Sequence, residues 1–123
     1  MARILVVDDE AIMTRMLTLL LQTEGYDVLA TERSDQAAEW IRTPGETIDL
    51  LISDIRMRPL NGMEILRLAR ECRPGLPVVL VTAYASRETQ DEARRLGALD
   101  YIPKPFKMER LLATVKGAVP PRA

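Results

Sequence analysis

The sequence predicts an α/β protein built on a parallel β-sheet. Five short apolar segments alternate with five segments of helical periodicity along 123 residues, and such alternation is typical of right-handed strand–helix–strand crossovers. The apolar segments are hydrophobic at consecutive positions, as in strands covered by helices on both faces. Asp8 and Asp9 follow the first segment and Asp54 follows the third. Because the carboxyl ends of parallel strands share one edge, where ligands bind, we expect these three acids to converge.

The first half of the chain has clear helix boundaries. Apolar side chains recur at helical spacing after residue 10 (Ile12, Met16, Leu19, Leu20), and Gly25 supplies a helix stop. Ser34 or Asp35 is the expected N-cap of a second helix that Pro44-Gly45 ends. We therefore expect strands over 4–7, 26–30 and 48–53, with helices over 11–24 and 35–43.

The second half repeats this pattern. Asn61 and Glu64 have capping-box spacing at the start of a helix that runs to about Cys72, which we expect to be buried. Ser86 is the expected cap of the next helix, and Gly97 its stop. We expect strands over 77–81 and 99–102 and helices over 87–96 and 106–118. Residues 1–119 then form one domain, and 120–123 a tail or the start of a linker.

Composition excludes several classes of function. The net charge is −1 with 28% charged residues, so the protein has no excess of positive charge that would favour binding to nucleic acid or to an anionic membrane. One cysteine excludes an internal disulfide, and no apolar run approaches the roughly 20 residues of a membrane span. With no signal-peptide pattern, we expect a cytoplasmic protein. The absence of histidine removes imidazole ligands and bases, so any metal must be a hard ion bound by oxygens.

Three converging carboxylates predict a Mg²⁺ or Mn²⁺ site, because a divalent cation offsets their repulsion. Asp9 and Asp54 are the expected direct ligands, and Asp8 acts through water. A backbone carbonyl after Asp54, that of Arg56, would complete the shell.

A metal beside a carboxylate also permits covalent chemistry, since aspartate can attack a phosphoryl group to form an acyl phosphate. Thr82, at the end of the fourth strand, is placed to hydrogen-bond a phosphoryl oxygen. Lys104, after the fifth strand, is placed to pair with the carboxylate or the phosphate. The sequence leaves open whether the Lys104–Pro105 bond is cis or trans.

Four motifs together resemble the receiver domain of two-component response regulators. They are Val7-Asp8-Asp9-Glu10, Asp54-Ile55-Arg56-Met57 with Gly62, Thr82-Ala83 and Lys104-Pro105-Phe106. The resemblance covers essentially the whole chain. It implies a flavodoxin-like (βα)5 three-layer sandwich with strand order 2-1-3-4-5.

The resemblance also implies a mechanism. Asp54 would be phosphorylated by a histidine kinase or phosphotransfer protein with Mg²⁺, and Asp8 and Asp9 would be the acidic metal pair. Thr82 would be the switch hydroxyl, Lys104 the phosphate-contacting lysine and Tyr101 the aromatic switch residue that turns inward when the threonine moves.

The chain departs from the family pattern after Asp54. Arg58 replaces a proline common in the family, with Pro59 following it, so we expect an altered loop path. Arg56 and Tyr84 occupy the two positions that tune loss of the phosphoryl group in the family. A cation and an aromatic ring there should restrict water and give slow to moderate autodephosphorylation.

The helix over 87–96 carries two apolar residues among many charges, so its anchoring to the sheet should be weak. We expect residues 84–110 to form the output surface, acting on a downstream output domain or protein target. A dimer, if one forms, would use the 84–119 face.

Two other functions fit the sequence poorly, and we do not expect a turnover enzyme. A metal-dependent phosphohydrolase needs a second carboxylate two residues after its nucleophile, where Asp54 is followed by Arg56. A flavin- or nucleotide-binding module needs a Gly- or Ser/Thr-rich loop after the first strand, where acids would repel phosphate.

Overall fold

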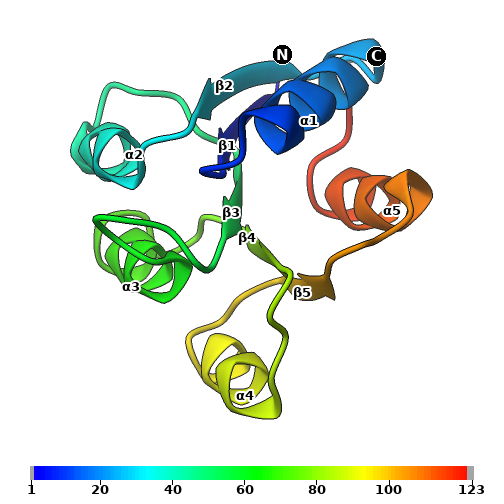
Figure 1. The fold of residues 1–123 in the computed structure, drawn as a ribbon. Coiled ribbons are helices and arrows are strands. Elements are labelled where there is room, and N and C mark those ends of the chain that lie inside the picture. The colour runs from blue at the N-terminus through cyan, green and yellow to red at the C-terminus, as the bar shows by residue number, and fades with distance from the viewer. Residues whose placement is uncertain (1, 122–123) are drawn as a thin grey trace.

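The computed structural model describes residues 2–121 and contains, within them, one sheet of five parallel strands. The strand order is β2-β1-β3-β4-β5, which confirms the expected topology. The elements are β1 (Arg3–Val7), α1 (Ala11–Thr23), β2 (Asp27–Thr31), α2 (Ser34–Arg42), β3 (Leu50–Asp54), α3 (Gly62–Cys72), β4 (Val78–Thr82), α4 (Arg87–Arg95), β5 (Asp100–Pro103) and α5 (Met108–Ala118). Helices α1 and α5 cover one face of the sheet, and α2, α3 and α4 cover the other (Figure 1).

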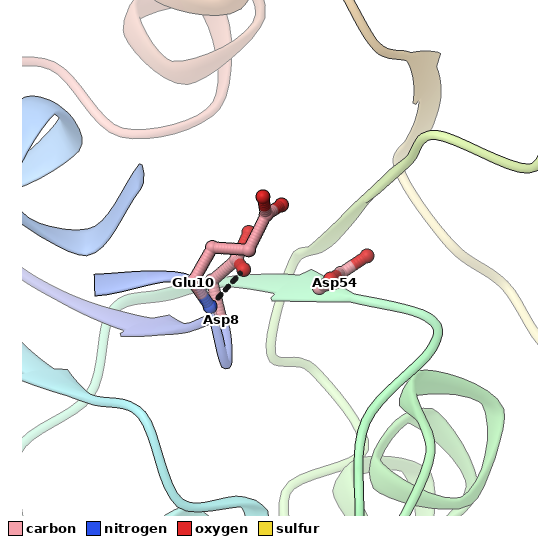
Figure 2. Close-up of side chains that lie close together, drawn as sticks. All are labelled: Asp8, Glu10 and Asp54. Atoms are coloured by element: carbon pink, nitrogen blue, oxygen red, sulfur yellow. Dashed lines mark hydrogen bonds between the residues drawn. The ribbon is translucent and has the colours of Figure 1, made fainter. Parts of the chain in front are cut away.

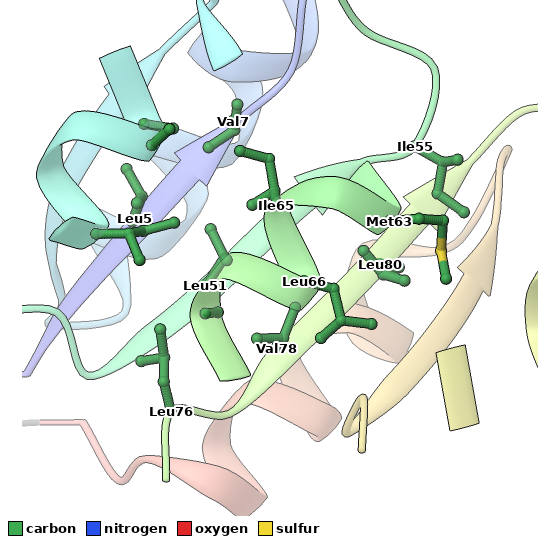
Figure 3. Packing of buried hydrophobic residues seen from close by; sticks show 14 of the residues in the cluster. Leu5, Val7, Leu51, Ile55, Met63, Ile65, Leu66, Leu76, Val78 and Leu80 are labelled. Atoms are coloured by element: carbon green, nitrogen blue, oxygen red, sulfur yellow. The ribbon is translucent and has the colours of Figure 1, made fainter. Parts of the chain in front are cut away.

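Alternate residues of each strand supply two separate hydrophobic cores. In β1, Leu5 and Val7 face the core under α2, α3 and α4, whereas Ile4 and Val6 face the core under α1 and α5. Figure 3 shows the first core, where α3 packs on the central strands. Because both faces are covered, β3 and β4 are buried along their whole length, which explains their continuous apolar sequences.

Strands β2, β3, β4 and β5 each end one residue later than expected, whereas β1 ends at Val7 as expected. Asp54 and Thr82 are the last residues of β3 and β4, and they take part in the pairing opposite Val81 and Pro103. Such polar residues end an apolar run in the sequence, although the backbone ladder continues through them. The pairing thereby fixes the backbone of both polar residues.

The apolar residues whose spacing predicts α1 do not form its buried face. Ile12 is 74% exposed, Met16 40% and Leu19 67%, whereas Thr14, Leu17 and Leu21 face the sheet. The segment 16–21 is apolar at nearly every position, so periodicity alone does not select one face. Packing on the sheet selects it, and the other apolar residues remain at the surface.

Two of the expected helix caps are confirmed and one is wrong. Asn61 and Glu64 form the capping box of α3, and the Ser86 side chain accepts the backbone N–H of Thr89 at the start of α4. In contrast, Arg33 is the N-cap of α2 and Ser34 lies inside the helix. The buried Ser34 hydroxyl instead accepts the backbone N–H of Leu60 at 2.9 Å, and so ties α2 to the loop after β3.

Other expectations are corrected on smaller points. Cys72 is exposed, because it ends α3 beyond the residues that contact the sheet. The last helix begins at Met108. The tail at 120–123 lies partly outside the described residues, which end at 121. Among the described residues, no helix is long and apolar enough to cross a membrane.

Candidate functional site

Polar side chains from four strand ends meet at one edge of the sheet. Asp8 follows β1, Asp54 ends β3 and Thr82 ends β4, and these three strands are direct neighbours in the sheet. Asp8 is 1% exposed, Asp54 6% and Thr82 1%, so polar groups are buried here beside two hydrophobic cores. Burial of that kind is costly unless each group finds a partner.

Lys104 is the partner that the acids share. Its Nζ lies 2.8 Å from Oδ2 of Asp8, 3.2 Å from Oε1 of Glu10 and 3.6 Å from Oδ2 of Asp54. The side chain of Lys104 is only 8% exposed. Its backbone N–H donates to the carbonyl of Thr82 at 2.7 Å, which holds the lysine against β4. The peptide bonds before Pro105 and Pro59 are both cis.

The charges at this edge do not balance. Asp8, Glu10 and Asp54 lie within ion-pair distance of the Lys104 ammonium, and Asp9 lines the same hollow with the Arg56 side chain, so four acids share two cations. Burial, and then the negative charge of Asp8, raise the pKa of Asp54 to about 6, although Lys104 opposes the shift. Burial lowers the pKa of Lys104, but its hydrogen bond and charge pairing with Asp8 outweigh this and the pKa is raised. The site therefore favours a further positive charge.

The carboxylates that lie closest together are those of Asp8, Glu10 and Asp54, whose oxygens are within 4.8 Å of one another. Figure 2 shows these side chains at the ends of β1 and β3, with the Glu10 backbone N–H donating to Asp8. Asp9 is exposed and lies outside this group. Glu10 is thus the site residue that the sequence analysis did not assign, although the unbroken run of three acids after β1 pointed to it.

The loop after β3 is held close to Asp54 by a glycine. The Gly62 backbone N–H donates to the carbonyl of Ile55 at 2.7 Å, and a Cβ at Gly62 would lie 2.2 Å from the Asp54 carbonyl oxygen. Only glycine fits this close approach. The Ile55 N–H in turn donates to Oδ1 of Asp54 at 2.8 Å, which orients the carboxylate.

Arg56 and Tyr84 form one rim of the site. The Arg56 guanidinium lies over the Tyr84 ring, 3.9 Å from its centroid, in the geometry of a cation–π contact. Beneath them is a hollow of about 350 Å³ lined by Asp9, Glu10, Asp54, Arg56, Ala83, Tyr84 and Lys104. A neighbouring hollow of about 470 Å³ is lined by Asp9, Ile55, Arg56, Met57, Arg58 and Asn61. Arg58, which replaces the family proline, therefore lies at the edge of the site.

The remaining expected residues are Thr82 and Tyr101. Oγ1 of Thr82 accepts the Tyr84 backbone N–H at 3.0 Å, at the start of the loop to α4. Tyr101 is half-buried on β5, and its hydroxyl contacts the first turn of α4. The structure thus brings Asp8, Asp54, Thr82 and Lys104 together and places Tyr101 against α4.

The raised pKa of Asp54 predicts that its charge destabilises the metal-free fold. The folded pKa of about 6 exceeds the unfolded value of 3.8, so ionised Asp54 costs stability above about pH 6 and the cost disappears as the pH falls toward 4. In EDTA at pH 7.5, Asp54→Asn should raise the free energy of unfolding by about 3 kcal/mol, since each unit of pKa difference corresponds to about 1.36 kcal/mol. Urea unfolding at a series of pH values measures it.

The advantage of Asp54→Asn over wild type should shrink between pH 7 and pH 4. Asp91→Asn, on the exposed surface of α4, is the matched control and should leave stability nearly unchanged. A destabilised Asp54→Asn protein, or a pH-independent difference, would contradict this account of the site.

The comparisons with known proteins agree with this geometry. The response regulator receiver domain family model matches residues 4–116. The transcriptional regulatory proteins ZraR and CpxR of Escherichia coli K12 are 39% and 35% identical over 116 residues, which is 94% of this chain. The chain spans about a quarter of ZraR and about half of CpxR, since the aligned shares are 26% and 48%.

Solved structures match over nearly their whole length. A CheY-like receiver domain protein from Methanospirillum hungatei is 32% identical, with a TM-score of 0.89 over 95% of this chain and 92% of that one. The response regulator TrrA from Thermotoga maritima, in complex with Mg²⁺–BeF, is 31% identical, with a TM-score of 0.85 over 97% and 100%. The chain belongs to the receiver domain family of two-component response regulators.

Proposed function

We propose that Asp54 accepts a phosphoryl group and that the resulting acyl phosphate is the signal this receiver carries. The observation that carries the proposal is the environment of Asp54: a buried carboxylate beside Asp8 and Lys104 that opens into a hollow of about 350 Å³. Ile55 N–H fixes one carboxylate oxygen at 2.8 Å. The other, Oδ2, lies 3.6 Å from Lys104. This arrangement supports attack by one oriented oxygen rather than a purely structural role.

The residues present fit Mg²⁺ or Mn²⁺ as the cofactor. Asp8 and Asp54, with Glu10 or Asp9, offer the carboxylate oxygens that these ions prefer, and the backbone carbonyl of Arg56 would add a neutral donor. The four acids outnumber the two cations at the site, Lys104 and Arg56, which supports binding of a further cation. When bound, the ion supplies positive charge beside the oxygens of the transferring phosphoryl group. The TrrA complex with Mg²⁺–BeF supports magnesium as the ion.

The chain's own residues would then act in a defined order. An Asp54 carboxylate oxygen forms a bond to phosphorus while the bond from phosphorus to the donor's leaving atom breaks, and its electron pair departs with that atom. Lys104 is close enough to move its ammonium from Asp8 and Asp54 to a phosphoryl oxygen. Thr82 would turn its hydroxyl from the Tyr84 N–H toward the same group.

The donor in this proposal is a protein with a phosphorylated histidine, such as a sensor kinase or a phosphotransfer protein. Support comes from α1, which begins directly after Glu10 and exposes Ile12, Met16 and Leu19 along one side. An exposed apolar face is typical of a protein–protein contact. Ile12, the first residue of this face, lies two positions after Glu10 in the sequence. A helix docked on the face would therefore lie next to Asp54. A small-molecule donor needs no such face.

The output in this proposal lies outside the 123 residues. The relatives ZraR and CpxR are named as transcriptional regulators and are two to four times longer than the matched segment. We propose that this receiver controls an output domain or a separate target protein through residues 84–110, and that it regulates rather than turns over a substrate.

Incubation with acetyl phosphate and Mg²⁺, followed by intact mass spectrometry, tests the proposed function. We expect one added phosphoryl group on the wild-type protein and none on Asp54→Ala or in EDTA. Asp49→Ala, directly before β3 and away from the site, is the control that should still be phosphorylated. A phosphoryl adduct that survives Asp54→Ala would overturn the assignment.

The contact between Arg56 and Tyr84 predicts a long-lived acyl phosphate, because the stacked pair covers one rim of the hollow and limits the approach of water. We expect a lifetime of minutes or longer. Arg56→Ala or Tyr84→Ala should shorten it roughly two- to fivefold, as loss of an exposed cation–π contact would. Decay of the phosphorylated mass after donor removal measures it.

Arg58→Ala is the matched control for this lifetime, since Arg58 lines the neighbouring hollow instead. A wild-type lifetime of only seconds, or equal decay in Arg56→Ala and wild type, would refute the role given to the pair.

A substitution on the exposed apolar face of α1 should affect phosphorylation by a protein donor but not by a small-molecule donor. Leu19→Asp should slow phosphotransfer from a phosphorylated histidine kinase at least tenfold, because a charge placed within an apolar contact typically costs more than about 1.4 kcal/mol. The same variant should react with acetyl phosphate at the wild-type rate. Thr23→Asp, at the far end of α1, is the control. Equal slowing with both donors would argue against a docking role for this face.

A further inference from the structure

A second hollow, here called the Arg58 hollow, adjoins the hollow into which Asp54 opens. Its volume is about 470 Å³, and it is lined by Asp9, Ile55, Arg56, Met57, Arg58 and Asn61. Asp9 and Arg56 line both hollows, so the two are direct neighbours. A molecule that reacts at Asp54 can therefore extend into the Arg58 hollow. The proposed function assigns no ligand to it.

The Arg58 hollow carries an excess of positive charge. The guanidinium groups of Arg56 and Arg58 line it together with one carboxylate, that of Asp9. The three acids that pair with the Lys104 ammonium do not line it. Two guanidiniums and one carboxylate sum to a single positive charge. The hollow therefore suits an anion of one negative charge, unlike the site around Lys104, which favours a cation.

Within residues 2–121, neither of these guanidiniums forms an ion pair with a carboxylate. The arginine ion pairs in this part of the chain are those of Arg3, Arg33, Arg67 and Arg110. Arg56 lies over the Tyr84 ring instead, and both Arg56 and Arg58 are exposed. An exposed guanidinium without an ion pair keeps its planar set of N–H donors available. It can bind an incoming carboxylate through two parallel hydrogen bonds.

The loop that carries both arginines is fixed by contacts at its far end. The Leu60 backbone N–H donates to the hydroxyl of Ser34 at 2.9 Å, and Ser34 is fully buried under α2. The Gly62 N–H donates to the carbonyl of Ile55 at 2.7 Å, which closes the loop. Residues 56–61 therefore run between fixed points. A loop fixed in this way loses less conformational freedom when a ligand binds.

Asn61 adds a neutral donor to the same wall. Its side-chain oxygen accepts the Glu64 backbone N–H at 2.9 Å, and its backbone N–H donates to the Glu64 carboxylate at 3.0 Å. The side-chain NH₂ group takes no part in this helix cap, so it can donate to a ligand. The lining thus offers two charged donors and one neutral donor, which is a set that suits a carboxylate.

We propose that the Arg58 hollow is a subsite for a carboxylate that the phosphodonor carries beside its phosphoryl group. Arg58 is the specificity-determining residue, because the Arg56 guanidinium is also engaged with Tyr84. The carboxylate can belong to an acidic side chain of a donor protein or to a small acyl phosphate. Its use by a donor rests on the proposed function. The subsite acts only while a donor is bound, so Arg58 has no part in the later decay of the acyl phosphate.

Two small phosphodonors that differ by one carboxylate test the subsite. With benzoyl phosphate and meta-carboxybenzoyl phosphate alike, an Asp54 oxygen forms a bond to phosphorus while the bond from phosphorus to the acyl oxygen breaks. The electron pair of that bond leaves on the benzoate product. Intact mass in Mg²⁺ measures the rate of phosphorylation with each donor. The readout is the ratio of the two rate constants, that of the charged donor over that of the neutral donor.

Arg58→Ala should lower this ratio roughly threefold to fivefold, the effect expected of an exposed ion pair. Arg58→Lys keeps the charge but loses the planar donor set, so its ratio should fall between those of wild type and Arg58→Ala. Arg42→Ala removes an exposed arginine in the last turn of α2 and is the matched control. Urea unfolding shows that each variant is folded.

A merely structural role of Arg58 would slow both donors alike and leave the ratio unchanged. An unchanged ratio in Arg58→Ala, or an equal fall in Arg42→Ala, would therefore overturn the subsite. A wild-type protein that gains no phosphoryl mass from either donor would instead refute the proposed function, so the two failures are distinguishable.

A second arm identifies the source of the carboxylate. The rate of phosphotransfer from a phosphorylated histidine kinase is divided by the rate with benzoyl phosphate. If an acidic side chain of the donor protein occupies the hollow, Arg58→Glu should lower this quotient at least tenfold, because two negative charges then face each other. A quotient equal to that of wild type would exclude the protein source and assign the carboxylate to small acyl phosphates.

Discussion

The ion pair between Lys104 and Asp8 is the contact on which the functional edge of this protein depends. It joins residues 96 positions apart at 2.8 Å, with both side chains almost fully buried. Removing one partner of such a pair would leave the other charge buried and unpaired, which is strongly destabilising. The pair still leaves Asp54 and two neighbouring acids short of positive charge. Burial, and then this excess of negative charge, raise the pKa of Asp54. The same excess favours ligands that carry positive charge or recruit it.

The sheet makes this arrangement possible, because β1, β3 and β4 are adjacent and parallel and their polar ends meet at one edge. The same edge connects to the far side of the molecule through a short polar path. Thr82 bonds to the loop after β4, and that loop bonds through Ser86 to Tyr101. In the proposed function, a phosphoryl group on Asp54 would compete for Thr82, so an event at the site would be felt at α4. The few apolar contacts of α4 make such a response inexpensive in free energy.

Much of this could be predicted from the sequence, since apolar runs and helix stops identify all five strands and the acids that follow them. The convergence of Asp8, Asp54, Thr82 and Lys104 follows from strand order, which is a property of the whole fold. The sequence did not identify Glu10, because its place depends on how Lys104 reaches back across the sheet. Periodicity predicted helix α1 but not which of its faces is buried, because apolar residues lie on several sides of the helix. Ser34 resembled a helix cap but bonds to Leu60, a contact between distant segments that local patterns do not encode.

Chemical mapping of the phosphoryl group tests the central proposal most directly. Borohydride reduces an aspartyl phosphate to homoserine, so the protein would be treated with acetyl phosphate and Mg²⁺, reduced and sequenced by tandem mass spectrometry. We predict homoserine at position 54 and aspartate retained at positions 8 and 9. Homoserine at position 8 or 9, or at no position in a protein that has gained phosphoryl mass, would contradict the role of Asp54 as the acceptor.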